Sequence, residues 1–249
     1  MATVYASTND ALVYKSLGGS PYWDGVHDST TGTAVISNAT SNGVAVAANC
    51  LAGGRGNIWL ASRVLMDFDT SGISVAPSAA TLKVYGITNG TADIIVLRSW
   101  QDLDDIATDW YNAMIDPTTT ISGNAWGTGH VTEYSNELTT WSTSGYNDIT
   151  LKAQALADMA SLDTFKLMIM EYDYDYRDVD PDLGGRSGCQ DRKSGLYFAD
   201  NTGTSKDPYI DYTPGVAAGY GNAVLGVASG NISTVNGVAT ANISKVNGV

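Results

Sequence analysis

The chain has 249 residues, of which 43% are hydrophobic and only 16% are charged, so we expect one large domain with a sizeable core. Its 27 glycines are typical of short strands joined by many turns rather than of long helices. Lysine and arginine together number 13 and aspartate and glutamate 26, which gives a net charge of −13. This acidity argues against binding to nucleic acid or to an anionic membrane, because basic patches attract both.

The N-terminal residues and the hydropathy pattern bear on where the chain is made. Residues 1–12 contain no basic segment followed by an apolar run, so the sequence shows no signal peptide. No apolar stretch approaches the roughly 18 residues that a membrane-spanning helix needs. We therefore expect a chain that is synthesised and folded in a cytoplasm, without being confined to it.

Cys50 and Cys189 are far apart in the sequence and match neither a CxxC motif nor a zinc-binding spacing. The two residues can form a disulfide or act as small apolar side chains of the core. Folding in a reducing cytoplasm favours the second interpretation, because disulfides are rare there.

Apolar and polar residues alternate along much of the chain, which predicts β-strands. Along residues 63–69, one face carries the apolar side chains Val64, Met66 and Phe68. The opposite face carries Arg63, Asp67 and Asp69. Residues 164–170 repeat this pattern, with a core face of Phe165, Leu167 and Ile169.

Further strands are expected at residues 2–14, 43–48, 80–85, 93–100 and 207–212. Turn-forming residues separate them, and no alternation of strands with long helices is seen, which indicates an antiparallel β-sandwich. Apolar residues recur at helical spacing in residues 102–114 and again in 151–162. We expect these segments to form one or two short helices that cap an open end of the sandwich.

The most concentrated polar feature is the acidic segment 171–182. On a strand, its first carboxylates would share one face and the tyrosines between them the other. Crowded carboxylates repel one another unless a cation screens them, and calcium prefers several carboxylate oxygens. The candidate calcium ligands are Glu171, Asp173, Asp175, Asp178 and Asp180. The spacing does not match an EF-hand, so a solvated acidic loop is the alternative.

Aromatic side chains offer a second route to binding. A platform that stacks on a sugar could include Trp23, Trp126 and Tyr174. In a sandwich of this size, several aromatic residues must instead belong to the core. A glycan site and core packing therefore both stand as interpretations of these residues.

Motifs that would indicate an enzyme are absent from the sequence. There is no GxSxG elbow, phosphate-binding loop, dinucleotide-binding fingerprint or HExxH motif. His27 and His130 lie among Gly, Asp and Thr residues and are interpreted as loop residues. No pair of carboxylates stands out as the acid and nucleophile of a glycosidase. We therefore expect a protein that is not an enzyme and that has no cofactor other than a calcium ion.

Several stretches resemble a known family. Residues 62–86 read SRVLMDFDTSGISVAPSAATLKVYG, residues 141–159 read WSTSGYNDITLKAQALADM, and residues 196–214 read LYFADNTGTSKDPYIDYTP. These stretches are similar to the DNRLRE-type jelly-roll domains, which resemble carbohydrate-binding modules, as they occur in virion proteins of tailed bacteriophages. The resemblance implies an all-β jelly roll over residues 1–213. Cellular members typically carry a signal peptide, so its absence favours the phage branch.

After residue 213 the composition changes. Residues 214–249 are rich in Gly, Val and Asn, and an 11-residue repeat of the type VNGVA runs through them. The regular apolar positions of the repeat are Val224, Val227, Ile232, Val235, Val238, Ile243 and Val246. A flexible linker needs no such regular stripe, so we expect a segment for attachment or oligomerisation; a linker is the alternative.

Together these features predict a non-enzymatic structural protein of a tailed-phage virion, such as a capsid decoration, a head fibre or a tail appendage. Its jelly roll would be displayed, and residues 216–249 would bind other virion proteins or further copies of the chain. The alternative is a carbohydrate-binding module for a host-surface or environmental polysaccharide. A virion protein that also holds a host glycan would combine the two.

Overall fold

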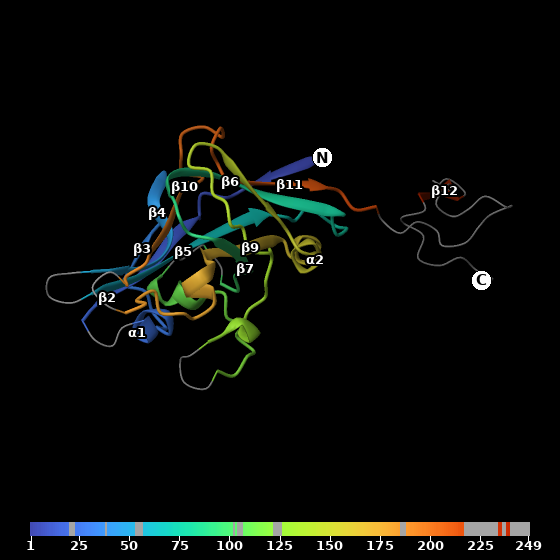
Figure 1. The fold of residues 1–249 in the computed structure, drawn as a ribbon. Coiled ribbons are helices and arrows are strands. Elements are labelled where there is room, and N and C mark those ends of the chain that lie inside the picture. The colour runs from blue at the N-terminus through green and yellow to red at the C-terminus, as the bar shows by residue number, and fades with distance from the viewer. Residues whose placement is uncertain are drawn as a thin grey trace.

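In a computed structural model the chain forms an antiparallel β-sandwich with a few short helices (Figure 1). The structure describes residues 1–19, 23–37, 39–52, 57–101, 103, 107–121, 126–184, 188–216, 234–235 and 238–239. It confirms the predicted all-β class, the antiparallel pairing and the short helices. The fold follows from the alternating pattern of the strands and from the turns that separate them.

Strands β1 to β11 all lie between residues 2 and 213. They are β1 (Ala2–Tyr5), β2 (Ala11–Gly18), β3 (Ala34–Ile36), β4 (Ser41–Leu51), β5 (Ile58–Asp69), β6 (Ala79–Gly90), β7 (Ile94–Arg98), β8 (Tyr146–Thr150), β9 (Thr164–Glu171), β10 (Asp191–Tyr197) and β11 (Tyr209–Thr213). The first layer contains β1, β11, the first half of β6, and β8. The second layer is centred on β5, which pairs with β2 on one side and with β4 and then β9 on the other.

Strand β6 connects the two layers. Its residues 79–85 pair with β11 and β8, whereas residues 86–90 pair with β10 of the second layer. Gly86 lies at the transition, and a Cβ atom there would be only 1.9 Å from the carbonyl oxygen of Ser142. A residue without a side chain is therefore needed where this strand passes from one layer to the other.

The main core fills the space between the layers. On the side of the first layer it contains Leu82, Val84, Ile149 and Ile210. On the side of the second layer it contains Val64, Met66, Phe68, Phe165, Leu167 and Ile169. These last six side chains are the ones that the alternating pattern assigns to the core face, and that prediction is confirmed.

A second core covers the other face of the second layer. Side chains of that sheet face, such as Ala61, Leu65 and Met168, pack there against Trp23, Tyr111 and Trp126. Helix α1 (Trp23–His27) and the 3₁₀ helix η2 (Thr108–Asn112) supply part of this cover, and Figure 1 shows α1 beside β2 and β5. The sheet is therefore buried on both sides, and Arg63 is buried although a charged residue opposite a core face usually meets solvent. Asp67 of the same strand is buried as well, and it accepts a hydrogen bond from the Ser7 hydroxyl.

The predicted helices have different outcomes. The helix expected at residues 151–162 is present as α2 (Ala153–Ser161), which places Ala155 and Met159 in the main core. In the described part of residues 102–114, the α-helix is replaced by the 3₁₀ helix η2. A further 3₁₀ helix, η3 (Thr128–His130), contains His130, and His27 lies in α1, so neither histidine is in an irregular loop.

Among the described helices, none has both the length and the apolar character needed to cross a membrane.

Two short strands of the repeat segment pair with each other. Strand β12 (Thr234–Val235) is antiparallel to β13 (Val238–Ala239). The other predicted assembly residues, Val224, Val227, Ile232, Ile243 and Val246, lie outside the described residues.

Candidate functional site

The acidic segment begins with a carboxylate that caps a turn. Strand β9 ends at Glu171, and one π-helical turn, η4 (Tyr172–Tyr176), follows. The Glu171 carboxylate accepts hydrogen bonds from the backbone N–H groups of Asp173, Tyr174 and Asp175 at 3.1, 2.7 and 3.1 Å. Burial raises the pKa of Glu171 to about 8, and these N–H donors oppose that shift. Because residues 172–176 form this turn, the expectation of a strand with carboxylates on one face and tyrosines on the other is wrong.

The next carboxylate, that of Asp175, forms a fully buried ion pair with Arg63. The Arg63 guanidinium donates from Nε and Nη2 to the two oxygens of Asp175 at 2.8 and 2.7 Å. Its Nη1 donates to the Tyr111 carbonyl at 2.7 Å and to Asn112 Oδ1 at 2.9 Å. Because Nη2 also reaches the carbonyl of His27 at 3.5 Å, one side chain of β5 joins η4, η2 and α1.

Next to this ion pair, His27 faces two carboxylates. Its Nδ1 atom lies 2.7 Å from Asp28 Oδ1 and 3.2 Å from Asp178 Oδ1. The imidazole is fully buried and stacks on the Trp126 indole, with 4.4 Å between ring centroids. Burial and the negative charges of Asp28 and Asp24 raise the pKa of Asp178, and the charge of His27 lowers it. One nitrogen and two carboxylate oxygens thus meet at the surface of the second core.

The carboxylates of the predicted calcium site lie in separate environments. Glu171 caps η4, Asp175 pairs with Arg63, and Asp178 faces His27. Asp173 lies 3.8 Å from Arg192 and near Asp93 and Glu137. Asp180 accepts a hydrogen bond from the Trp59 indole at 3.1 Å. The structure does not gather these side chains around one point, which corrects the expectation of a common site.

The aromatic residues expected at a glycan site are core residues. Trp23 and Trp126 are each 2% exposed and Tyr174 is 8% exposed, and all belong to the second core. The Trp126 indole N–H donates to the His27 carbonyl at 3.2 Å. A sugar ring needs an accessible aromatic face, so the structure corrects the assignment of these residues to a stacking platform.

A different set of aromatic side chains lies on the outer surface of the first layer and extends to the end of β10. Neighbouring rings are in contact, with centroid distances of 5.5 Å for Tyr5 and Tyr209, 5.0 Å for Tyr209 and Tyr146, 5.1 Å for Tyr146 and Tyr85, and 5.6 Å for Tyr85 and Tyr197. Tyr5 is 46% exposed and the others are half-buried. We call Tyr5, Tyr85, Tyr146, Tyr197 and Tyr209 the tyrosine face; its rings are tilted by 46° to 82° to their neighbours, so they are not coplanar.

Polar groups surround the tyrosine face. The Lys206 ammonium lies 4.2 Å from the centroid of the Tyr197 ring and donates to its hydroxyl at 3.0 Å. Lys83 and Asp148 form an ion pair at 2.5 Å on the same sheet face. Burial raises the pKa of Tyr146 to about 12, so its hydroxyl stays neutral and can donate and accept hydrogen bonds. The surface thus combines aromatic rings, hydroxyls and both charges.

The sequence pattern missed this face because its members come from five strands or their ends. The alternating positions of Tyr5, Tyr85, Tyr146 and Tyr209 are visible in the chain, but the register that brings them together is not. In the structure Tyr5 lies directly opposite Tyr209, and Tyr85 opposite Tyr146. Cross-strand neighbours of this kind are close enough for their side chains to interact.

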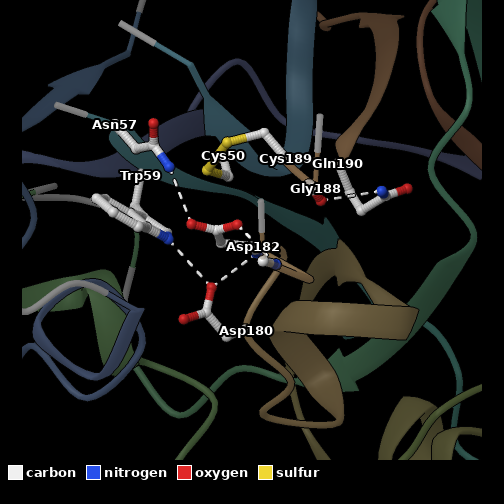
Figure 2. The surroundings of a disulfide bond; sticks show 9 residues. Cys50, Asn57, Trp59, Asp180, Asp182, Gly188, Cys189 and Gln190 are labelled. Carbon is white, nitrogen blue, oxygen red and sulfur yellow. Dashed lines mark hydrogen bonds between the residues drawn. A yellow bond between two sulfur atoms is a disulfide. The ribbon is translucent and has the colours of Figure 1, made fainter. Parts of the chain in front are cut away.

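At the end of the second layer, Cys50 and Cys189 form a disulfide (Figure 2). Their Cα atoms are 4.7 Å apart, and 139 positions separate them in the sequence. The interpretation of the two cysteines as unpaired core residues is therefore wrong. Figure 2 shows Asp180 and Asp182 below the disulfide, in the part of the acidic segment that we call the acidic loop. There Asn57 donates to Asp182 at 2.9 Å and Trp59 donates to Asp180. The disulfide and these bonds hold the loop against β4 and β5.

In comparisons with known proteins, no family model matches the chain, and no curated protein matches it either.

Proposed function

We propose that the chain is a non-enzymatic structural protein of a tailed-phage virion, in which a displayed sandwich is anchored by its repeat segment. The observation that carries the proposal is the separation of the two parts. Strands β1 to β11 pair among themselves within residues 2–213, whereas β12 pairs only with β13 in the described part of the repeat. The sandwich thus has its strand partners without the repeat, which leaves the repeat for contacts with another chain.

The position of the sandwich termini supports a single attachment point. Strand β1 pairs with β11, and Ala2 lies opposite Tyr212 at the edge from which residues 214–216 continue (Figure 1). A domain that is held at one edge leaves its remaining surface accessible. The Cys50–Cys189 disulfide also suits a protein that works outside the reducing cytoplasm. The resemblance to phage DNRLRE-type domains points in the same direction, with capsid decorations, head fibres and tail appendages as the roles.

The test of anchoring compares the full chain with a truncated chain of residues 1–215. We expect the truncated chain to keep the thermal unfolding transition of the sandwich and to be monomeric in light scattering. The full chain is expected to form oligomers or to co-sediment with phage particles. Identical monomers that both fail to bind particles would contradict the anchoring role, and an unfolded truncation would contradict the independence of the sandwich.

A second candidate function, carbohydrate binding, is favoured by the tyrosine face. Tyrosine rings that keep an apolar face and a hydroxyl are suited to ligands with both apolar and polar edges, and sugars have both. The adjacent Lys206 and the Lys83–Asp148 pair add hydrogen-bonding groups for sugar hydroxyls or carboxylates. In this interpretation the virion protein binds a polysaccharide at the host surface or in the surroundings.

Calorimetry against a panel of neutral and acidic polysaccharides tests this second function. We expect weak binding to one class, and a loss of about tenfold in affinity for Tyr209→Ala, which corresponds to about 1.4 kcal/mol. Tyr14→Ala is the matched control, because Tyr14 is a half-buried tyrosine of β2 outside the tyrosine face. Absence of binding across the panel, or equal losses for the two variants, would count against carbohydrate binding by this face.

A further inference from the structure

The donor atoms around His27 form a compact group. Its Nδ1 lies 2.7 Å from Asp28 Oδ1 and 3.2 Å from Asp178 Oδ1, and the three ligand atoms are all within 4.8 Å of one another. The His27 side chain is fully buried, whereas the side chains of Asp28 and Asp178 are 21% and 43% exposed. The group is therefore closed on the imidazole side and open to solvent on the carboxylate side.

The surroundings hold the imidazole in one orientation. The ring stacks on Trp126 with 17° between the planes, and Trp23 lies on it at a centroid distance of 5.8 Å. The carbonyl of His27 accepts hydrogen bonds from the Trp126 indole and from Arg63. The other ring nitrogen, Nε2, is buried without a hydrogen-bond partner among the described residues, so stacking on Trp126 orients the imidazole.

The charge balance at the group favours a cation. The two side chains that face His27 Nδ1, Asp28 and Asp178, are both carboxylates. Arg63, the nearby buried cation, forms its ion pair with Asp175. A divalent ion at this point would balance the charges of both carboxylates.

The donor types indicate which ion fits. Calcium and magnesium are bound mainly by oxygen, whereas zinc and similar ions accept imidazole nitrogen together with carboxylate oxygen. With metal–ligand distances of about 2.0 to 2.2 Å and tetrahedral geometry, neighbouring donor atoms lie about 3.3 Å apart. The 3.2 Å between His27 and Asp178 is close to that value, and the 2.7 Å to Asp28 would widen by about half an ångström on binding.

We propose that His27, Asp28 and Asp178 bind a divalent transition-metal ion of the zinc type. The site is distinct from the tyrosine face and from the repeat segment. His27 is the last residue of α1, Asp28 follows it, and Asp178 lies in the turn after η4, so a bound ion would join these two segments at the surface of the second core.

The test is calorimetric titration of the full chain with Zn²⁺ after treatment with a chelator, in buffer without reductant so that Cys50 and Cys189 stay paired. We expect one equivalent of Zn²⁺ to bind and excess Ca²⁺ not to displace it. Asp28→Asn and Asp178→Asn keep the side-chain shapes and lie at the exposed side of the group, so both variants are expected to fold. Each should weaken Zn²⁺ binding by about tenfold or more.

Two control variants separate this site from the rest of the chain. His130→Gln removes the other histidine, and Asp93→Asn alters the separate carboxylate cluster of Asp93, Glu137 and Asp173. Both are expected to bind Zn²⁺ as the unmodified chain does. The absorption spectrum of the Co²⁺-loaded protein should show ligation without a thiolate charge-transfer band. Absence of Zn²⁺ binding, binding unaffected by Asp28→Asn and Asp178→Asn, or binding lost in either control would overturn the proposal.

Discussion

Replacement of Asp175 by asparagine is expected to lower the free energy of unfolding by about 3 to 5 kcal/mol. The reason is that Arg63 has no access to solvent and would keep its charge in the core without a counterion. The remaining acceptors, the carbonyls of Tyr111 and His27 and the amide oxygen of Asn112, are neutral and cannot replace the carboxylate. Urea unfolding followed by tryptophan fluorescence measures the change.

The same substitution at an exposed ion pair is the matched control. Asp148 pairs with Lys83 on the surface, where its side chain is 60% exposed, so Asp148→Asn should cost no more than about 1 kcal/mol. A double variant, Arg63→Met with Asp175→Leu, removes both buried charges and should recover part of the stability lost in Asp175→Asn. Equal costs for Asp175→Asn and Asp148→Asn would mean that the buried ion pair does not have the role assigned to it.

Arg63 also illustrates what the sequence alone leaves open. The alternation in residues 63–69 correctly assigns Val64, Met66 and Phe68 to the core between the layers. The opposite face of β5 carries Arg63 and Asp67, and such residues ordinarily indicate solvent. Whether a charged side chain on that face meets water or a partner depends on which distant segments cover it. Here η2 and η4 supply that cover, and they come from other parts of the chain.

Long-range contacts also decide how the residues of the candidate sites are arranged, and the sequence does not show these contacts. The acidic segment was visible as composition, but its side chains are distributed by a π-helical turn that strand periodicity does not predict. Asp178, in the turn after η4, lies next to His27 of α1, and this is a long-range contact. The tyrosine face depends on the register of several strands. Local patterns therefore predict the class of fold, whereas the sites depend on which segments become neighbours.

The disulfide is another long-range contact that the sequence alone does not predict, and its removal should have a large effect on stability. Removing it by Cys50→Ser with Cys189→Ser is expected to lower the free energy of unfolding by about 3 to 5 kcal/mol, because the crosslink closes a long loop of the unfolded chain. The sequence separation of 139 makes this a long loop, for which the loss of entropy in the unfolded chain is large. Urea unfolding of both proteins, with and without reductant, measures the effect.

The fold itself should persist in the double variant. The acidic loop stays attached through the hydrogen bonds from Asn57 to Asp182 and from Trp59 to Asp180, and Cys50 N–H still has the Gln190 carbonyl as its partner. Reductant should therefore bring the unmodified chain to the stability of the variant and leave the variant unchanged. If the two proteins unfold at the same urea concentration under oxidising conditions, the crosslink contributes nothing. If the variant loses its folded signal altogether, the hydrogen bonds of this loop depend on the crosslink. In that case the disulfide is needed to form this end of the second layer and does more than constrain the unfolded chain.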